Sequence, residues 1–182
     1  DVMNLTEKTV EKHTLYKGFI INLRVDDALL PDGRPCKREM VEHPAGAAVL
    51  CVEDGKVLLV RQFRYAYGEE LLEIPAGKLD KGEDPAHAAA RELEEETGRV
   101  AERVEKLFTL YPTPGYTNEK LHVFLAHGVH MGHVHPDDDE FVSVVRIPLA
   151  DVSAMIADGR IRDAKTIAAV QRYLLDKAEG GR

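Results

Sequence analysis

Apolar and polar residues alternate loosely through the first part of the chain, a pattern that predicts β-strands. The segment TLYKGFIINLRVDDALL, which starts at Thr14, follows this alternation and ends at the turn-forming cluster PDGRP. CKREMVEH, which starts at Cys36, predicts a further strand. We therefore expect residues 1–43 to form a small antiparallel β region.

A denser apolar pattern begins near Ala47. AAVLCVEDGKVLLVRQF contains two apolar runs joined through Asp54-Gly55, a dipeptide that favours a hairpin turn. ELLEIPAG predicts a short strand that Pro75 and Gly77 stop, and later strands are predicted in VEKLFTLYP, LHVFLAHGVHM and FVSVVRIPL, with PTPGYTNEK as a loop. Many strands with few helices indicate an α+β domain with a mixed sheet over residues 44–178.

Helical periodicity and end signals predict helices in the second half of the chain. The first follows Asp84, a favourable N-cap, starts with Pro85 and ends at Gly98, which suits the left-handed C-terminal position. A narrow face of small residues is expected to pack closely on a sheet: Ala86, Ala90, Leu93 and Thr97. LADVSAMIADG and DAKTIAAVQRYLLDKA predict two more helices, and EGGR, residues 179–182, is expected to be a frayed tail.

Length and composition fit one globular domain. With 182 residues, 44% of them hydrophobic, the chain can bury a substantial core. The longest apolar run, Ala45 to Val52, is too short to span a membrane. The N-terminal DVMNLTEKTVEK lacks the apolar stretch of a signal peptide, so we expect none.

Charge and cysteine content narrow the classes of partner. A net charge of −8 argues against sequence-independent binding to nucleic acid or anionic membranes, which requires a basic surface. An anionic substrate would have to meet a local cluster of Arg and Lys or bound cations. Cys36 and Cys51 show no metal-ligand spacing and are too few for a disulfide framework, so we expect a reducing, cytoplasmic location.

The first predicted helix carries four glutamates within five positions, from Glu92 to Glu96. Like charges this close destabilise a helix. Glu92 and Glu96 share one face, Glu95 borders it, and Arg91 can pair with Glu95. Three converging carboxylates suit a magnesium or manganese ion, which would cancel the repulsion. The alternative is a solvated helix face held by ion pairs.

The residues around these glutamates resemble the signature of the Nudix hydrolases. The positions that match are Gly77, Glu83, Arg91, Glu92, Leu93, Glu95, Glu96 and Gly98, and Arg99 departs from the aliphatic residue usual at the last position. The resemblance implies a Nudix-type α/β/α sandwich with a mixed sheet, in addition to the N-terminal β region. It also implies hydrolysis of a nucleoside diphosphate linked to another moiety.

The resemblance also assigns roles within the signature. Glu92 and Glu96 would be the main metal ligands, Glu95 a ligand or near neighbour, and the Ala76 carbonyl a further donor. Glu83 and Arg91 would brace the loop and the helix. Bound divalent ions would absorb charge on the pyrophosphate and activate a water, and a carboxylate would accept its proton.

Segments outside the signature resemble the ADP-ribose pyrophosphatase branch of that family. RQFRYA, LLEIPAG and YPTPGYTNEK carry the likeness, and Pro114 lies fifteen positions after Arg99. The implied substrate-binding residues are Arg64, Glu73, Gly115, Arg38 and Glu39, the last two reaching the neighbouring subunit's site in an intertwined homodimer. Alternatively, Arg64 is a surface strand arginine and Arg38 and Glu39 are an exposed strand pair.

The acidic stretch HPDDDEFV offers further carboxylates. In the resembling branch a loop carries two acids spaced two apart, one catalytic and one binding metal, which would be Asp138 and Glu140 here. The alternative is a solvated acidic turn. Two other groups suggest sites that we do not favour: a zinc site at His130, His133 and His135, which lacks a placed fourth ligand, and adenine stacking by Tyr16, Phe19 and Tyr116, for which core packing is preferred.

The sequence thus predicts a magnesium-dependent Nudix hydrolase, with manganese as a substitute, that cuts ADP-ribose to AMP and ribose 5-phosphate as a homodimer. One alternative is a pyrophosphatase for other nucleoside diphosphate sugars, such as GDP-mannose. Another is a catalytically inactive nucleotide-sugar sensor, against which the intact glutamates argue. Neither nucleic acid nor membrane is an expected partner.

Overall fold

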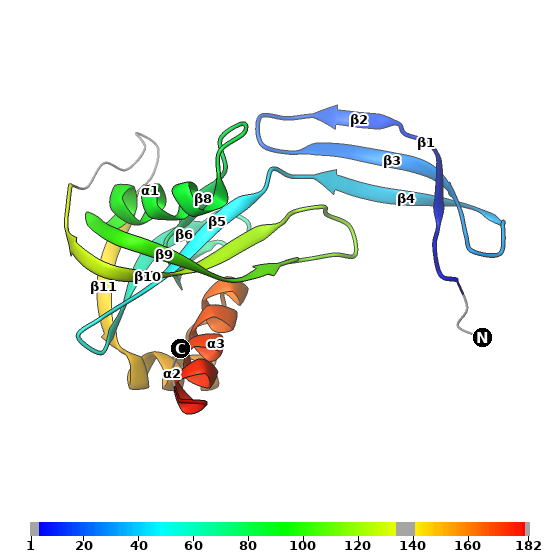
Figure 1. The fold of residues 1–182 in the computed structure, drawn as a ribbon. Coiled ribbons are helices and arrows are strands. Elements are labelled where there is room, and N and C mark those ends of the chain that lie inside the picture. The colour runs from blue at the N-terminus through cyan, green and yellow to red at the C-terminus, as the bar shows by residue number, and fades with distance from the viewer. Residues whose placement is uncertain (1–3, 134–140, 181–182) are drawn as a thin grey trace. The chain divides into compact units, whose positions relative to one another are not determined.

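The computed structural model describes residues 4–133 and 141–180 and divides the chain into two compact units (Figure 1). The first unit consists of Asp1–Pro44 and Tyr111–Lys120, and the second of Ala45–Leu110 and Leu121–Arg182. The chain therefore leaves the first unit and returns to it once, through the predicted loop PTPGYTNEK.

The first unit is an antiparallel sheet, as predicted. Its strands are β1 (Lys8–Glu11), β2 (Thr14–Lys17), β3 (Asn22–Leu29) and β4 (Pro35–Glu42). β3 pairs with each of the other three strands. The returning loop lies along β4, because Val41 forms a β-bridge with Thr117 and its N–H donates to Tyr116 O at 2.7 Å.

The second unit is built on a mixed sheet. Its strands are β5 (Gly46–Glu53), β6 (Lys56–Arg64), β7 (Glu69–Glu73), β8 (Ala76–Lys78), β9 (Arg99–Leu110), β10 (Leu121–Met131) and β11 (Val142–Pro148). The main order is β11-β6-β5-β10-β9, with β7 paired to β6, β8 paired to β5, and β10 running parallel to β5. The hairpin between β5 and β6 forms as predicted: Asp54 and Gly55 have φ of 50° and 72°, the left-handed values that a tight hairpin turn requires.

Helices cover both faces of this sheet (Figure 1). α1 (Pro85–Thr97) lies on one face, and α2 (Leu149–Ala157) and α3 (Ala164–Ala178) lie on the other. β5 serves two cores: Val49 packs in the cluster that includes Leu93 of α1, and Leu50 in the cluster that includes Val170 of α3. A strand buried on both sides has apolar residues at consecutive positions. This confirms the α/β/α sandwich.

The ends of α1 are those predicted, but its buried face is different. The Asp84 side chain accepts from the N–H of Ala86 and of His87, and Gly98 closes the helix with φ 65°. The prediction is confirmed at Leu93 and Thr97, which are buried, and at Ala86, which is half-buried and packs against the core cluster, but it was wrong at Ala90, which is only half-buried. The buried positions are Ala88, Ala89, Glu92, Leu93, Glu96 and Thr97. A hydrophobic pattern misses this face because two of its members are glutamates.

Core packing was also the wrong expectation for three aromatic residues of the first unit. Tyr16 and Tyr116 are exposed, and Phe19 is 100% exposed. Elsewhere, both cysteines are free thiols, and burial raises the pKa of Cys51 to about 11. In the described part of the chain, no helix combines the length and apolarity needed to cross a bilayer.

Candidate active site

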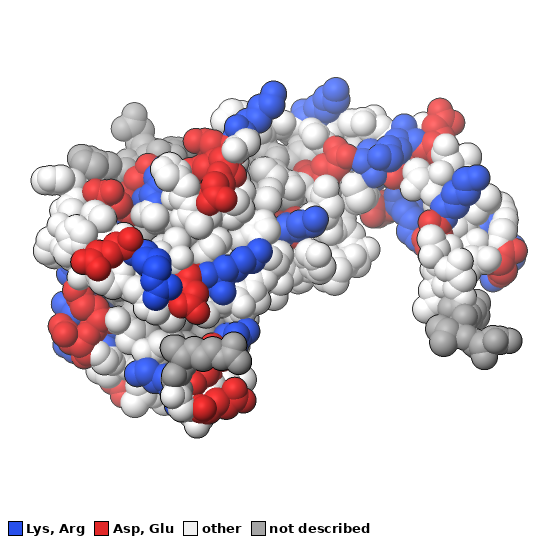
Figure 2. All heavy atoms as spheres, viewed as in Figure 1, with Lys and Arg blue, Asp and Glu red and all other residues white. Residues whose placement is uncertain are grey.

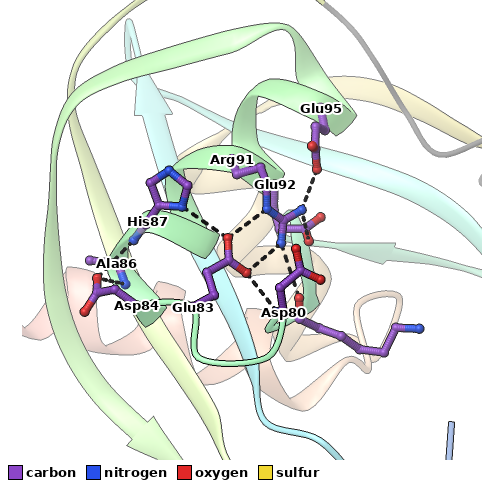
Figure 3. Close-up of polar contacts among 9 residues, drawn as sticks. Asp80, Glu83, Asp84, Ala86, His87, Arg91, Glu92 and Glu95 are labelled. Atoms are coloured by element: carbon purple, nitrogen blue, oxygen red, sulfur yellow. Dashed lines mark hydrogen bonds and ion pairs between the residues drawn. The ribbon is translucent and has the colours of Figure 1, made fainter.

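A salt-bridged loop leads from β8 into α1 (Figure 3). Glu83 accepts from Arg91 Nε at 3.0 Å and Nη2 at 3.2 Å, from the Asp80 N–H at 2.9 Å, and contacts His87 Nδ1 at 3.1 Å. The Arg91 hydrogen bonds lower the pKa of Glu83 to about 2, against the opposing effect of burial. The loop is therefore closed onto the helix by an ionised carboxylate.

The Arg91 guanidinium extends from this loop to the glutamate cluster. Its Nη1 lies 2.9 Å from Glu92 Oε1 and 2.6 Å from Glu95 Oε2 (Figure 3). Nη2 also donates to the Lys78 carbonyl at 3.3 Å. Hydrogen bonding to Glu83, and then the charges of Glu92 and Glu95, raise the pKa of Arg91. The positive charge of Arg91 thus offsets part of the repulsion between the glutamates of α1.

Glu92 and Glu96 are buried against β8. Their exposed fractions are 6% and 2%, and the Ala76 N–H donates to Glu96 Oε2 at 3.2 Å. A Cβ placed on Gly77 would lie 2.0 Å from Glu92 Oε1, so only glycine leaves room for this carboxylate. Two carboxylates that are adjacent on one helix face are therefore fixed beside the backbone of Ala76 and Gly77.

These donors fit a hard divalent cation. Glu92, Glu96 and the Ala76 carbonyl are oxygen donors of the kind that magnesium and manganese prefer, and burial makes an added positive charge favourable. Glu95 borders this set but is paired with Arg91. In residues 4–133 and 141–180, the only three His, Cys, Asp or Glu side chains with ligand atoms within 4.8 Å of one another are Glu11, His13 and Asp27. The expected convergence of all three carboxylates of Glu92, Glu95 and Glu96 is therefore wrong at that distance. In the Glu11 group, the ammonium of Lys37 already pairs with Asp27.

Arg64 and Glu73 form a bidentate pair in the same unit. Arg64 Nε and Nη2 donate to the two Glu73 oxygens at 2.6 and 2.7 Å, and Glu73 is 1% exposed. Hydrogen bonding to Glu73 raises the pKa of Arg64, and the charges of Asp163 and Glu96 contribute in the same direction. Arg64 is thus a partly exposed arginine fixed by a buried carboxylate.

The other predicted substrate residues lie in the first unit. Arg38, Glu39 and Gly115 line one pocket of about 240 Å³. Arg38 donates from Nε and Nη2 to Glu7 at 2.8 and 2.5 Å. The structure therefore gathers the predicted substrate residues into two sets, one in each unit.

Three residues named in the sequence analysis are not placed, and one residue beside the predicted site was missed. Asp138, Glu140 and His135 lie outside the described residues. Sequence reasoning missed Lys165, which contacts Glu73 from α3. The available signal was its position four residues before Ala169, on the apolar face of the helix.

Charged side chains of both signs are interspersed over the visible face of the molecule (Figure 2). The net charge of −8 is therefore not gathered there into one acidic surface.

Comparison with known proteins identifies one family and several close relatives. The NUDIX domain family model matches residues 41–170. An ADP-ribose pyrophosphatase of Bacillus subtilis (strain 168) is 43% identical over 96% of this chain and 96% of its own. A methanol dehydrogenase activator of Bacillus methanolicus is 40% identical over 94% and 95%. A GDP-mannose pyrophosphatase of Yersinia enterocolitica serotype O:8 / biotype 1B (strain NCTC 13174 / 8081) is 41% identical over 74% and 75%.

A solved structure shares the whole fold. It is described as the crystal structure of an ADP compounds hydrolase and superposes with a TM-score of 0.86, covering 97% of this chain and 98% of that chain. The sequence identity is 22%, so the likeness establishes the fold.

Proposed function

This chain belongs to the Nudix hydrolase family, and from that premise we propose that it hydrolyses the pyrophosphate bond of ADP-ribose to give AMP and ribose 5-phosphate. One observation carries the proposal: Glu92 and Glu96, in the second half of a braced helix, are buried carboxylates held beside Ala76 and Gly77 of β8. Burying two carboxylates side by side costs free energy unless a cation binds them. A cation held there would in turn neutralise the charge of a diphosphate.

Magnesium is the cation that we propose, with manganese as a substitute. The ligands would be Glu92, Glu96 and the Ala76 carbonyl, with Glu95 and Glu140 as further carboxylates. When bound, the cation neutralises diphosphate oxygens and lowers the pKa of a water molecule. Arg91 and Glu83 keep α1 and its loop rigid, so the two buried carboxylates do not have to reorganise when substrate arrives.

The chain also supplies the proton acceptor and an anion contact. Water oxygen attacks one phosphorus, the bridging P–O bond breaks, and a carboxylate takes the water proton. The candidates for that acceptor are Glu95, Asp138 and Glu140. Arg64, whose plane is fixed by Glu73, presents guanidinium N–H groups suited to phosphate oxygens.

The relatives support ADP-ribose over other nucleoside diphosphate sugars. The Bacillus subtilis ADP-ribose pyrophosphatase aligns over nearly the whole chain, including the first unit. The GDP-mannose pyrophosphatase aligns over a smaller part. Because the first unit contains Arg38, Glu39 and Gly115, a match there is relevant to substrate choice.

We also propose that residues 1–43 mediate a homodimer. Apolar side chains are exposed across this region: Leu5, Val10, Leu15, Tyr16, Phe19, Ile20 and Ile21. Exposed apolar side chains in this number are typical of protein–protein interfaces. In such a dimer Arg38 and Glu39 would contribute to the partner subunit's site. Two free thiols are consistent with the cytoplasmic location that we infer.

A substrate panel tests the proposed function. Release of phosphate monoester is measured for ADP-ribose, GDP-mannose and NADH, each with magnesium and with excess EDTA. We expect the highest kcat/KM for ADP-ribose and no turnover in EDTA. A preference for GDP-mannose would contradict the proposed substrate but leave the proposed pyrophosphate hydrolysis intact. Tight binding of all three without turnover would favour the inactive sensor.

A further inference from the structure

The start of α3 is joined to the connection between β7 and β8 by buried polar contacts. Asp163, the N-cap of α3, accepts from the Thr166 N–H at 3.0 Å and from Thr166 Oγ1 at 2.5 Å. Thr166 Oγ1 in turn accepts from the Ile74 N–H at 2.8 Å. Two residues further on, the Ala76 N–H donates to Glu96. The segment that supplies Ala76 is therefore held between α3 and α1.

Lys165 lies inside this junction. It is 8% exposed, its Nζ pairs with Glu73 Oε2, and Asp163 Oδ1 lies 3.0 Å away. A buried ammonium group destabilises a protein unless carboxylates surround it, and a whole buried ion pair can often be replaced by apolar residues without loss of stability. Stability alone therefore does not explain a lysine at this position.

The partner of Lys165 is also the partner of Arg64. Burial raises the pKa of Glu73, but the Arg64 hydrogen bond and the Lys165 charge outweigh this and lower it, so Glu73 is an anion shared by two cations. Lys165 also pairs with Asp163, so the two cations and two carboxylates balance one another. What Lys165 contributes is position: it holds one oxygen of the Glu73 carboxylate, and both oxygens of that carboxylate fix the plane of the Arg64 guanidinium.

We propose that Lys165 is a positioning residue that acts through Glu73 on Arg64, so that the guanidinium stays oriented toward a diphosphate substrate. The inference rests on the proposed function, since it requires an anionic substrate near Glu96. It adds α3, which carries none of the signature residues, to the machinery of the site.

A double-mutant cycle tests this inference. Lys165→Met, Arg64→Ala and the double variant are compared in steady-state hydrolysis of ADP-ribose. We expect Lys165→Met to raise KM on the order of tenfold, with a smaller change in kcat. In the Arg64→Ala background the same substitution should have almost no further effect on KM, because residues that act through one another are not additive. Lys165→Arg, which keeps the charge, should recover part of the loss.

Matched measurements separate positioning from a loss of folding. Lys177→Met removes an exposed lysine of the same helix and should leave KM unchanged. Thermal unfolding checks each variant, and Lys165→Gln replaces Lys165→Met in the cycle if the latter does not fold. Equal effects of the Lys165 substitution with and without Arg64, or a KM equal to that of the unmodified protein, would overturn the inference.

The outcome is independent of the substrate identity. If GDP-mannose is cleaved and ADP-ribose is not, the cycle is run with GDP-mannose. If neither is cleaved, the proposed function fails, and the cycle is read from calorimetric binding of ADP-ribose and GDP-mannose. Binding by Lys165→Met as tight as that of the unmodified protein then contradicts the positioning role.

Discussion

Glu96 has the most deeply buried carboxylate of the cluster on α1. Glu96→Gln keeps the size of this side chain and removes its charge. We expect kcat/KM for ADP-ribose to fall at least about 100-fold, and the magnesium requirement to rise, because a hard cation loses an anionic ligand. Steady-state kinetics over a series of magnesium concentrations measures both effects.

Glu94→Gln is the matched control, since it removes one charge from the same helix at a half-buried position. Its activity should stay close to that of the unmodified protein. Near-normal turnover by Glu96→Gln would mean that Glu96 is not a metal ligand. Equal losses in the two variants would mean that the cluster acts only through its general charge.

Single residues differ in how well the sequence predicts them. The shared face of Glu92 and Glu96 follows from their spacing, because four positions return to the same side of a helix. Their burial does not follow, because it depends on residues of another element: Glu92 lies against Gly77, and Glu96 accepts from the Ala76 N–H. The contact of Lys165 is harder still to predict, because its partner Glu73 lies 92 positions earlier in the chain.

At the level of elements, the loop and α1 behave as one unit held by Glu83 and Arg91. The pKa of Glu83 is about 2 in the folded protein and near 4.5 when unfolded, so its contribution to stability is complete above pH 4.5 and decreases as the pH falls toward 2. We expect Glu83→Gln to lower the free energy of unfolding by about 1–3 kcal/mol at pH 7. Urea unfolding at pH 7 and pH 3.5 should show a smaller difference between the two proteins at the lower pH.

A difference that stays constant between these pH values would mean that the Glu83 carboxylate is not the stabilising species. Loss of activity without loss of stability would instead place Glu83 in contact with substrate or cation. The expected result is a loss of both stability and activity, because the loop holds α1, and with it Glu92 and Glu96, against β8.

Elements defined by local signals are the ones that the sequence predicts well. Asp84 and Gly98 set the ends of α1 through contacts within a few residues, and Asp54-Gly55 sets the hairpin. β1 was missed because KTVE is polar and exposed, and it becomes a strand only by pairing with β3. Tertiary pairing of that kind has no local signature.

For the whole molecule, the division into units also depends on long-range pairing. The sequence places Tyr111–Lys120 between two strands of the main sheet, yet these residues belong to the first unit through the bridge from Val41 to Thr117. Gly115 therefore joins Arg38 and Glu39 in one pocket. That grouping makes the first unit a candidate contributor to substrate binding as well as to assembly.

Phe19 tests whether the first unit assembles the protein. Its side chain is fully exposed in an apolar region, so Phe19→Asp should leave the fold intact and weaken any interface there, because a charge would be buried in the dimer. Light scattering should find about twice the 20.3 kDa chain mass for the unmodified protein, and the chain mass for Phe19→Asp.

The control is Tyr65→Asp, which changes an exposed aromatic residue of the second unit and should remain dimeric. If Arg38 and Glu39 act in the partner's site, the monomer also loses activity, whereas a Phe19→Asp dimer would place the interface elsewhere.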